Sequence, residues 1–165
     1  MPVEKTGAAG GDRARSTAAT ASEARAIVRT AAHGALATLD LATGTPYASL
    51  VLVAAHPDGS PVLLLSALAA HTRNARADPR ASLLCSATEA AADPLAGARV
   101  TLTGRLAESR ADADRDLFLA RHAGAARYAD VPDFGFFRLE LSGAHFNGGF
   151  GRIVTLTAAD LRAAL

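Results

Sequence analysis

Short apolar runs separated by turn signals fill most of this chain. The cleanest pattern covers residues 99–107, where Val100, Leu102 and Leu106 alternate with polar positions. A period of two places alternate side chains on opposite faces of a strand. By the same criteria the sequence predicts strands at residues 35–39, 47–54, 62–65, 81–87, 99–107, 136–146 and 152–156.

A long helix is expected before the first strand. Thr20 and Glu23 have the spacing of a capping box, and the apolar residues that follow fall on one helical face: Ala24, Ile27, Val28 and Ala31. Gly34 is expected to end this helix. Residues 1–19 are rich in Gly, Ala, Ser and Arg, so we expect a mobile tail followed by one domain over residues 20–165.

Three more helical segments are predicted between and after the strands. Residues 67–77 are compatible with a short, polar helix. Ser109 is expected to cap a helix over residues 112–122, with Gly124 as its stop signal, and Thr157 is expected to cap a last helical turn.

The order of these elements indicates a mainly β (α+β) fold. Neighbouring strands are mostly joined by short links, so they should pair antiparallel. We therefore expect an antiparallel split β-barrel with peripheral helices rather than a doubly wound sheet.

Composition narrows the function classes only slightly. The chain has 165 residues and a formal net charge of +1, so no overall field favours nucleic acid or an anionic membrane. Cys85, the single cysteine, lies in an apolar run and excludes an internal disulfide and a thiolate zinc cage. No long apolar span or signal peptide is recognisable, so the expected location is the cytoplasm.

The densest polar cluster begins at a strand end and continues into the short polar helix. Amide donors at a helix start, hydroxyls and a guanidinium together suit a phosphate group, although a solvated helix face would give the same pattern. The cluster comprises Ser66, His71, Thr72, Arg73, Asn74 and Arg76.

Two other places could carry chemistry. Arg99 lies on the polar face of the long strand, where a plain surface arginine is the alternative. The run FNGGFG at residues 146–151 would let the backbone approach a ligand closely, and a turn without a ligand is the alternative. The histidines show no metal-ligand spacing, so a metal site is not expected.

Several of these runs resemble one known superfamily. GALATL at residues 34–39 and GTPYAS at 44–49 are similar to the opening strands of the pyridoxamine 5′-phosphate oxidase-like, FMN-binding split barrels. LSALAAHTRN at 65–74 and DPRASLL at 78–84 resemble the haem-utilisation (HugZ-like) branch. Further matches follow in the expected order, and the resemblance covers about residues 20–160.

The resemblance implies a homodimer with two FMN sites at the subunit interface. Its cofactor-binding positions match Ser49, Leu50, Ser66, His71, Thr72, Arg73, Asn74 and Arg99, with the phosphate against the segment from Ser66 to Asn74. Its substrate side matches Asn147, Gly149 and Phe150.

The function that this resemblance implies is an FMN-dependent oxidoreductase acting on a small-molecule substrate or electron donor. The alternatives are a haem-binding or haem-degrading protein and a deazaflavin-binding relative. The Arg-Leu-x-Pro ending of true pyridoxamine phosphate oxidases is absent, and no histidine follows His145. We therefore expect neither that oxidase substrate nor efficient turnover of free haem.

Overall fold

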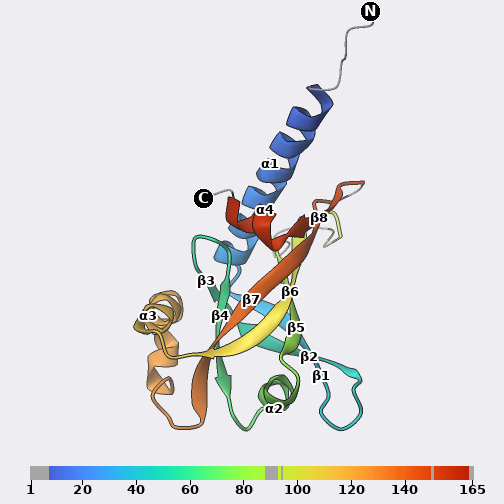
Figure 1. The fold of residues 1–165 in the computed structure, drawn as a ribbon. Helices are drawn as coiled ribbons and strands as arrows, with labels where there is room; N and C mark the ends of the chain where they lie inside the picture. The colour runs from blue at the N-terminus through green and yellow to red at the C-terminus, as the bar shows by residue number, and fades with distance from the viewer. Residues whose placement is uncertain (1–7, 88–92, 94, 150, 164–165) are drawn as a thin grey trace, which may run out of the picture.

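A single antiparallel sheet, curled into a half-barrel, forms the body of the molecule (Figure 1). The structure is a computed structural model that describes residues 8–87, 93, 95–149 and 151–163. In this part of the chain the strand order is β2-β1-β5-β6-β7-β4-β3, with β8 paired to β7. The strands are β1 (His33–Leu39), β2 (Pro46–Leu52), β3 (Ala54–Ala55), β4 (Pro61–Ser66), β5 (Arg80–Ser86), β6 (Arg99–Ser109), β7 (Phe134–Asn147) and β8 (Ile153–Thr157).

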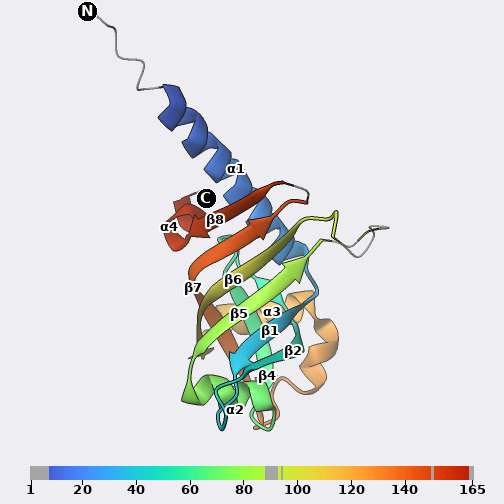
Figure 2. The ribbon, with the colours of Figure 1, turned by 90° about the vertical axis from the view of Figure 1, so that its right-hand side faces the viewer.

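Helices cover the ends and one side of the half-barrel (Figures 1 and 2). Within the described residues no helix is long and apolar enough to cross a membrane. The helical elements are α1 (Ala8–Thr30), α2 (Ala70–Ala77), α3 (Asp112–Arg121), the 3-10 turn η1 (Ala123–Arg127) and α4 (Ala158–Ala163).

The core lies inside the curl of the sheet. Leu36, Leu83 and Leu102 sit side by side on β1, β5 and β6 and are almost completely buried. The small and β-branched face of α1, which includes Ala24 and Val28, packs against this cluster. The alternation predicted for β6 is confirmed, because Val100, Leu102 and Leu106 are buried.

A second, smaller cluster joins α3 to the β3–β4 side of the sheet. Phe118 is fully buried against Val62 and Ala125. Its ring makes an edge contact with Phe136 of β7, with 5.8 Å between the centroids. This packing fixes α3 and η1 beside one edge of the barrel.

The first helix is longer than the sequence indicated. α1 begins at Ala8, so residues 8–19 of the expected tail are helical, and Thr20 is not an N-cap. The Thr20 hydroxyl instead donates to the carbonyl of Ser16 one turn earlier, at 2.9 Å. Ala and Arg are strong helix formers, and they extend the helix past the capping signal.

Gly34 does not end that helix either. α1 stops at Thr30, and Gly34 lies within β1. A Cβ at this position would lie 2.8 Å from the carbonyl oxygen of Leu84 on β5. The glycine therefore permits close packing of two strands rather than a helix C-cap.

Three other local predictions have mixed outcomes. Residues 47–54 form two strands, β2 and β3, separated at Val53. The N-cap of α3 is Ala111 and not Ser109, and Gly124 lies inside η1. The cap at Thr157 is confirmed, because its hydroxyl and amide both bond Asp160 and the Asp160 amide donates back.

Candidate functional site

A cleft lies between β2 and β4 and beside α2. Its volume is about 330 Å³. Apolar and aromatic side chains make up most of the wall, and Ser66 and His71 are its polar members. The lining residues are Leu50, Val51, Leu52, Leu64, Leu65, Ser66, Ala69, His71, Tyr128 and Phe134.

The structure brings four of the predicted site residues to this cleft. Leu50, Ser66 and His71 line it directly. Ser49 lies behind His71, with its Oγ 3.0 Å from the Nδ1 atom of the imidazole. Burial lowers the pKa of His71 below its ordinary value, which favours the neutral ring at physiological pH.

Arg73 lies beside the cleft on the first turns of α2. Its side chain is exposed, and its guanidinium donates to the carbonyl of Leu68. Leu68 lies in the chain between Ser66 and Ala69, which both line the cleft. The Ser66 hydroxyl accepts from the Leu68 amide at 3.2 Å. The hydroxyl of Ser66 and the imidazole of His71 therefore line a mostly apolar cleft, and the guanidinium of Arg73 lies on the same short segment of chain.

Asn74 and Thr72 face the barrel instead of the cleft. Asn74 accepts from the Leu41 amide at 3.1 Å and donates to Thr38 Oγ1 at 3.2 Å, so its side chain fixes α2 against β1. Thr72 is fully buried, and its hydroxyl has no hydrogen-bond partner among the residues that the structure describes. These positions hold the helix in place, and neither lines the cleft.

Arg99 and Asn147 lie apart from the cleft in the folded chain. They face each other in the register of β6 and β7. Since β1 and β5 separate β6 from β2, about 14 Å of sheet lies between Arg99 and the strand that carries Ser49. The Arg99 guanidinium donates to the carbonyls of Leu95 and Gly97 at 3.0 and 3.3 Å, closing the loop before β6.

Gly149 forms a tight turn with the side chain of Asn147. Its amide donates to Asn147 Oδ1 at 3.0 Å, and its φ of +99° is a conformation that favours glycine. A Cβ there would lie 2.7 Å from the carbonyl of Ala96, so this turn packs tightly on the loop before β6. Phe150, the third residue predicted on the substrate side, lies outside the described residues.

Arg99 and Leu50 nevertheless share the outer face of the sheet. On this face, neighbouring residues that point outward form a row across six strands. Large apolar side chains on the face are exposed: Leu50 by 74%, Leu84 by 41% and Ile153 by 59%. An apolar sheet face of this kind is typical of a protein interface. The row comprises Leu50, Ala35, Leu84, Thr101, His145 and Thr155.

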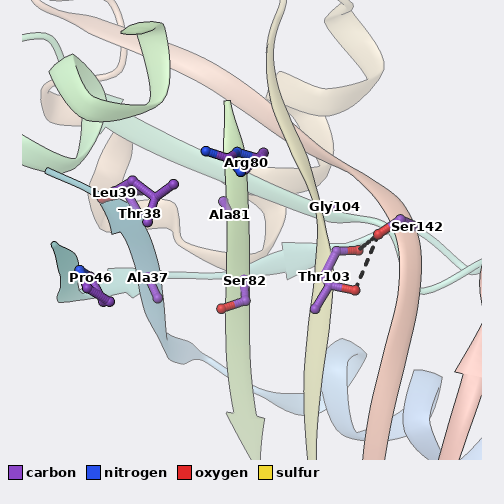
Figure 3. Close-up of a pocket in the computed structure, with 10 residues that line it drawn as sticks. All are labelled: Ala37, Thr38, Leu39, Pro46, Arg80, Ala81, Ser82, Thr103, Gly104 and Ser142. Carbon is purple, nitrogen blue, oxygen red and sulfur yellow. Dashed lines mark hydrogen bonds between the residues drawn. The ribbon is translucent and has the colours of Figure 1, made fainter. Parts of the chain in front are cut away.

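A shallower cavity of about 380 Å³ lies elsewhere on this outer face (Figure 3). It is bordered by small and hydroxyl side chains, including Ser82, Thr103 and Ser142, beside a bulge in β6. Its charged residue, Arg80, is engaged by Asp78. No residue of the predicted site lines it, so we place the functional site at the cleft between β2 and β4.

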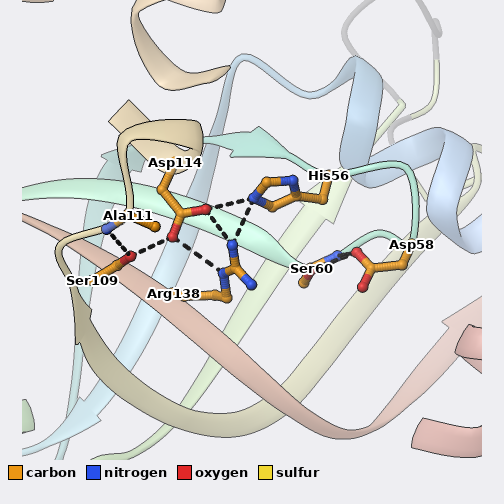
Figure 4. A network of polar contacts seen from close by, with 7 residues as sticks. All are labelled: His56, Asp58, Ser60, Ser109, Ala111, Asp114 and Arg138. Atoms are coloured by element: carbon orange, nitrogen blue, oxygen red, sulfur yellow. Dashed lines mark hydrogen bonds and ion pairs between the residues drawn. The ribbon is translucent and has the colours of Figure 1, made fainter. Parts of the chain in front are cut away.

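A polar network between α3, β7 and the β3–β4 turn was not predicted (Figure 4). Asp114 of α3 has no exposed side-chain surface and accepts from Ser109 Oγ at 2.5 Å and from Arg138 Nε at 3.2 Å. His56 Nε2 lies 2.6 Å from Asp114 Oδ1. Burial would raise the pKa of Asp114, but the bonds from Arg138, Ser109 and His56 outweigh it and hold the pKa at about 2.

Sequence reasoning did not select two aromatic residues that line the cleft, Tyr128 and Phe134. Their rings contact each other with 4.9 Å between centroids and form the aromatic wall of the cleft. No local pattern indicated that either residue would face β2.

The comparisons with known proteins agree with this fold. A sequence model described as "CREG, beta-barrel" matches residues 15–161. The chain belongs to the CREG β-barrel family. The superfamily expected from the sequence, that of the FMN-binding split barrels, is thereby confirmed.

Two relatives and one structure of the same fold show what the chain is similar to. The structure of a haem-binding protein from Mycobacterium smegmatis is 39% identical, with a TM-score of 0.82, and the match covers 87% of this chain and 60% of that one. A pyridoxinephosphate oxidase family protein from Clostridium acetobutylicum shares the fold at 13% identity, with a TM-score of 0.67 over 87% of this chain and 98% of that one. The non-canonical heme oxygenase HOZ of Arabidopsis thaliana is 37% identical over 100 residues, or 59% of this chain.

These matches leave large parts of two relatives uncovered. The aligned segment spans 30% of the Arabidopsis protein and 60% of the mycobacterial chain. Because these proteins contain long segments that this chain does not match, the ligand of this chain depends on the residues of its own cleft.

Proposed function

We propose that this protein binds haem, and that it does so as a homodimer in the cleft between β2 and β4. The observation that carries the proposal is the composition of that cleft. Apolar and aromatic side chains line most of it, and Ser66 and His71 from the segment that joins β4 to α2 add polar groups. A porphyrin ring with two propionates has the same division between a wide apolar body and an anionic edge.

The residues present fit such a ligand. Leu52, Leu64 and Phe134 provide apolar surface for a flat ring, and Ser66 with His71 provides polar groups at the edge. Arg73 supplies the charge that a carboxylate favours. When bound, haem would supply one-electron and oxygen chemistry, which no side chain of this cleft offers by itself.

A second copy of the chain would complete the site. The cleft in one subunit is near the lower end of the roughly 300–1,000 Å³ that ligand pockets occupy. Burying the exposed leucines of the outer face against a second copy would enlarge it, and would allow Arg99 and Asn147 of one subunit to approach the cleft of the other. The homodimer expected from the sequence thus remains our proposal.

The relatives add support to the haem assignment. The mycobacterial protein at 39% identity is named for haem binding, and the Arabidopsis protein at 37% identity is named a haem oxygenase. The proposal for this chain concerns binding; a reaction partner or electron donor and the cytoplasmic location stay predictions from the sequence.

FMN is the second candidate, favoured by one specific feature. Ser66, His71 and Arg73 lie around a strand end and the first turns of α2, an arrangement that also suits a phosphate. Thr72 and Asn74, which the sequence added to this phosphate site, do not line the cleft. The cleft therefore offers fewer hydrogen-bond donors to an FMN phosphate than the sequence predicted.

Titration of the purified protein with haemin, FMN and riboflavin tests the proposal. We expect a Soret band that saturates at one haemin per subunit, and a Leu52→Glu variant that weakens binding at least tenfold. Leu41→Glu, which changes an exposed leucine on the β1–β2 turn that does not line the cleft, serves as the control. Saturable FMN binding without haemin binding would replace this proposal with the second candidate.

Sedimentation analysis of the Leu84→Glu variant tests the dimer. A charge placed on the outer apolar face should convert a dimer to a monomer at micromolar concentration, whereas Leu41→Glu should leave it dimeric. A wild-type protein that is monomeric and still binds haemin would refute a site completed by two subunits.

A further inference from the structure

A further cavity lies in a gap of the sheet beside β7, away from the proposed haem cleft. β4 pairs with β7 as far as Arg138, and β8 pairs with it from Gly143 onward, so no described strand pairs with residues 139–142 on this edge. The cavity occupies this gap. Its lining comes from the turn before β4, from β7 and from α4, and its volume is about 230 Å³. The described residues that line it are all different from those that line the cleft between β2 and β4.

The carbonyl of Leu139 points into this gap without a donor from a strand. Along an antiparallel strand, the backbone groups of successive residues point to alternate sides. Leu106, which lies opposite Leu139, donates its amide on the far side of β6, towards β5, so the backbone groups of Leu139 point away from β6 and into the gap. The register of Val62 with Arg138 places Pro61 opposite Leu139. Proline has no N–H, so β4 supplies no donor to the Leu139 carbonyl.

Two carboxylates line the same cavity. Asp58 accepts from the amide of Ser60 at 2.9 Å and also from its hydroxyl, both at Oδ1, so Oδ2 has no bond from another described residue (Figure 4). Burial would raise the pKa of Asp58, but the bonds from Ser60 outweigh it and lower the pKa, so this carboxyl is ionised at neutral pH. Glu140 is exposed and forms no ion pair with a described residue. Together with the Leu139 carbonyl, these side chains provide acceptors for a group with several N–H donors.

The rest of the lining suits an aliphatic group and a carboxylate. Leu139 and Leu161 are almost completely buried and belong to the main core. Arg138 is held by Asp114, whereas Arg162 is exposed and has no ion-pair partner among the described residues. The volume is below the roughly 300–1,000 Å³ of most ligand pockets, so the occupant must be small.

We propose that this cavity binds a small aliphatic α-amino acid. Its ammonium group donates to the Leu139 carbonyl and to the carboxylates of Asp58 and Glu140, since an ammonium has three hydrogens to donate. Its side chain packs on Leu161, and its carboxylate faces Arg162. A ligand with a charge of one sign would use only one of these two sets of groups. The proposal does not rest on haem binding, because the two sites share no described residue.

Three molecules of similar shape but different charge test this assignment. L-Leucine carries both charges, 3-methylbutylamine lacks the carboxylate, and 4-methylpentanoate lacks the ammonium group. Titration into ¹⁵N-labelled protein is followed at the amides of Leu139, Leu141 and Leu161. We expect saturable shifts with leucine, binding of the amine that is weaker by roughly tenfold, and no saturable shift with the acid. Equal affinity for leucine and either of the other molecules, or no saturable shift at these amides with leucine, overturns the proposal.

Asp58→Asn and Glu140→Gln test the two carboxylates. Asparagine keeps an oxygen that can accept from the Ser60 amide, so the turn before β4 should still form. We expect each change to weaken leucine binding by about fivefold and to leave haemin affinity unchanged. Asp116→Asn, which removes an exposed carboxylate of α3 that does not line the cavity, is the control. An equal loss in the control would reduce the effect to net charge and refute the site.

Pro61→Ala tests the contact to the Leu139 carbonyl. The His56 amide donates to the Ser60 carbonyl at 3.1 Å on the β3 side, so the nitrogen of residue 61 faces β7. Alanine adds an N–H that can occupy this carbonyl, and leucine binding should weaken by about threefold. Pro57→Ala, in the same turn, should leave leucine affinity unchanged.

Unchanged leucine affinity in Pro61→Ala would refute the contact to the carbonyl. A wild-type protein that binds haemin but not leucine would refute this inference and leave the proposed function standing. Leucine binding without haemin binding would support the inference and refute the proposed function.

Discussion

His56 and His71 each lie next to a polar side chain, but their surroundings differ in one respect. Around His56, the carboxylate of Asp114 has no exposed surface and is bonded by three side chains. Around His71, Ser49 makes one bond and the second ring nitrogen is left open beside a cavity. One histidine belongs to a completed network and the other to an incomplete one.

The difference distinguishes polar groups that stabilise the fold from polar groups that are available to a ligand. A buried charge is tolerated when hydrogen bonds surround it, and the network around Asp114 meets this condition while joining α3 to β7 and to the β3–β4 turn. A ring nitrogen that has no partner among the described residues, beside an apolar cleft, contributes little to the fold and remains available to a ligand. Substitutions in the Asp114 network should therefore change stability, and substitutions in the cleft should change ligand binding.

The largest effect is expected from Asp114→Asn. The change removes the charge that holds Arg138 and His56, so the free energy of unfolding should fall by about 2–3 kcal/mol. Arg138 can reach solvent, since its side chain is 40% exposed, and this keeps the loss below that of a fully enclosed pair. Urea unfolding measures the change, with Asp130→Asn as a surface control expected to cost less than about 1 kcal/mol.

Haemin affinity should stay within about threefold of wild type in the same variant. Asp114→Asn protein that keeps its stability but loses haemin binding would show that we have assigned the two regions the wrong way round.

Acid unfolding should reveal the same carboxylate. The folded pKa of Asp114 is about 2, below its ordinary value of 3.8, so the folded state favours the ionised form. This stability is present above pH 4 and is lost as the pH falls towards 2, by about 2 kcal/mol in total. Comparing wild type with Asp114→Asn at each pH isolates this contribution; parallel stability curves for the two proteins would contradict it.

Arg73→Ala should have a smaller effect, confined to the ligand. Removing this guanidinium from the cleft edge should weaken haemin binding about tenfold, or about 1.4 kcal/mol, without changing the urea midpoint. Arg76→Ala is the matched control, because Arg76 lies one turn later on α2 and pairs with Glu108. Equal losses of affinity in the two variants would indicate a general electrostatic effect.

The smallest expected effect is the pH dependence that arises from His71. Its folded pKa is lowered by burial, so the unfolded chain takes up a proton more readily than the folded one. Stability should therefore decline slightly as the pH falls below the ordinary histidine value of 6.5 towards the folded pKa. The decline should disappear in His71→Gln; a variant that retains it would assign the titration to another group.

The fold was largely predictable because its signals are local. The alternation along β6 and the turn residues between strands gave the antiparallel half-barrel, and Thr157 with Asp160 gave the last helix. The start of α1 was missed because alanine and arginine continue a helix without any further signal. The role of Gly34 was missed because it depends on Leu84, fifty positions away.

The site was predictable only in part, since it depends on how the sheet curls. The sequence selected Leu50, Ser66 and His71, which line the cleft, but it also selected Asn74, whose side chain is used to anchor α2. The network of His56 with Asp114 and Arg138 joins residues 58 and 82 positions from His56. No local pattern connects such residues, because only the closed fold brings them together.

The central claim, that the cleft between β2 and β4 is the haem site and the Asp114 network is not, is tested most directly by mapping where a haem analogue binds. Gallium protoporphyrin IX is diamagnetic and can be titrated into ¹⁵N-labelled protein. We predict the largest amide shifts at the cleft, around Leu52, Ser66 and Phe134, with unchanged signals around Asp114 and Arg138. Shifts centred on the Asp114 network, or saturating shifts elsewhere with none at the cleft, would contradict the account.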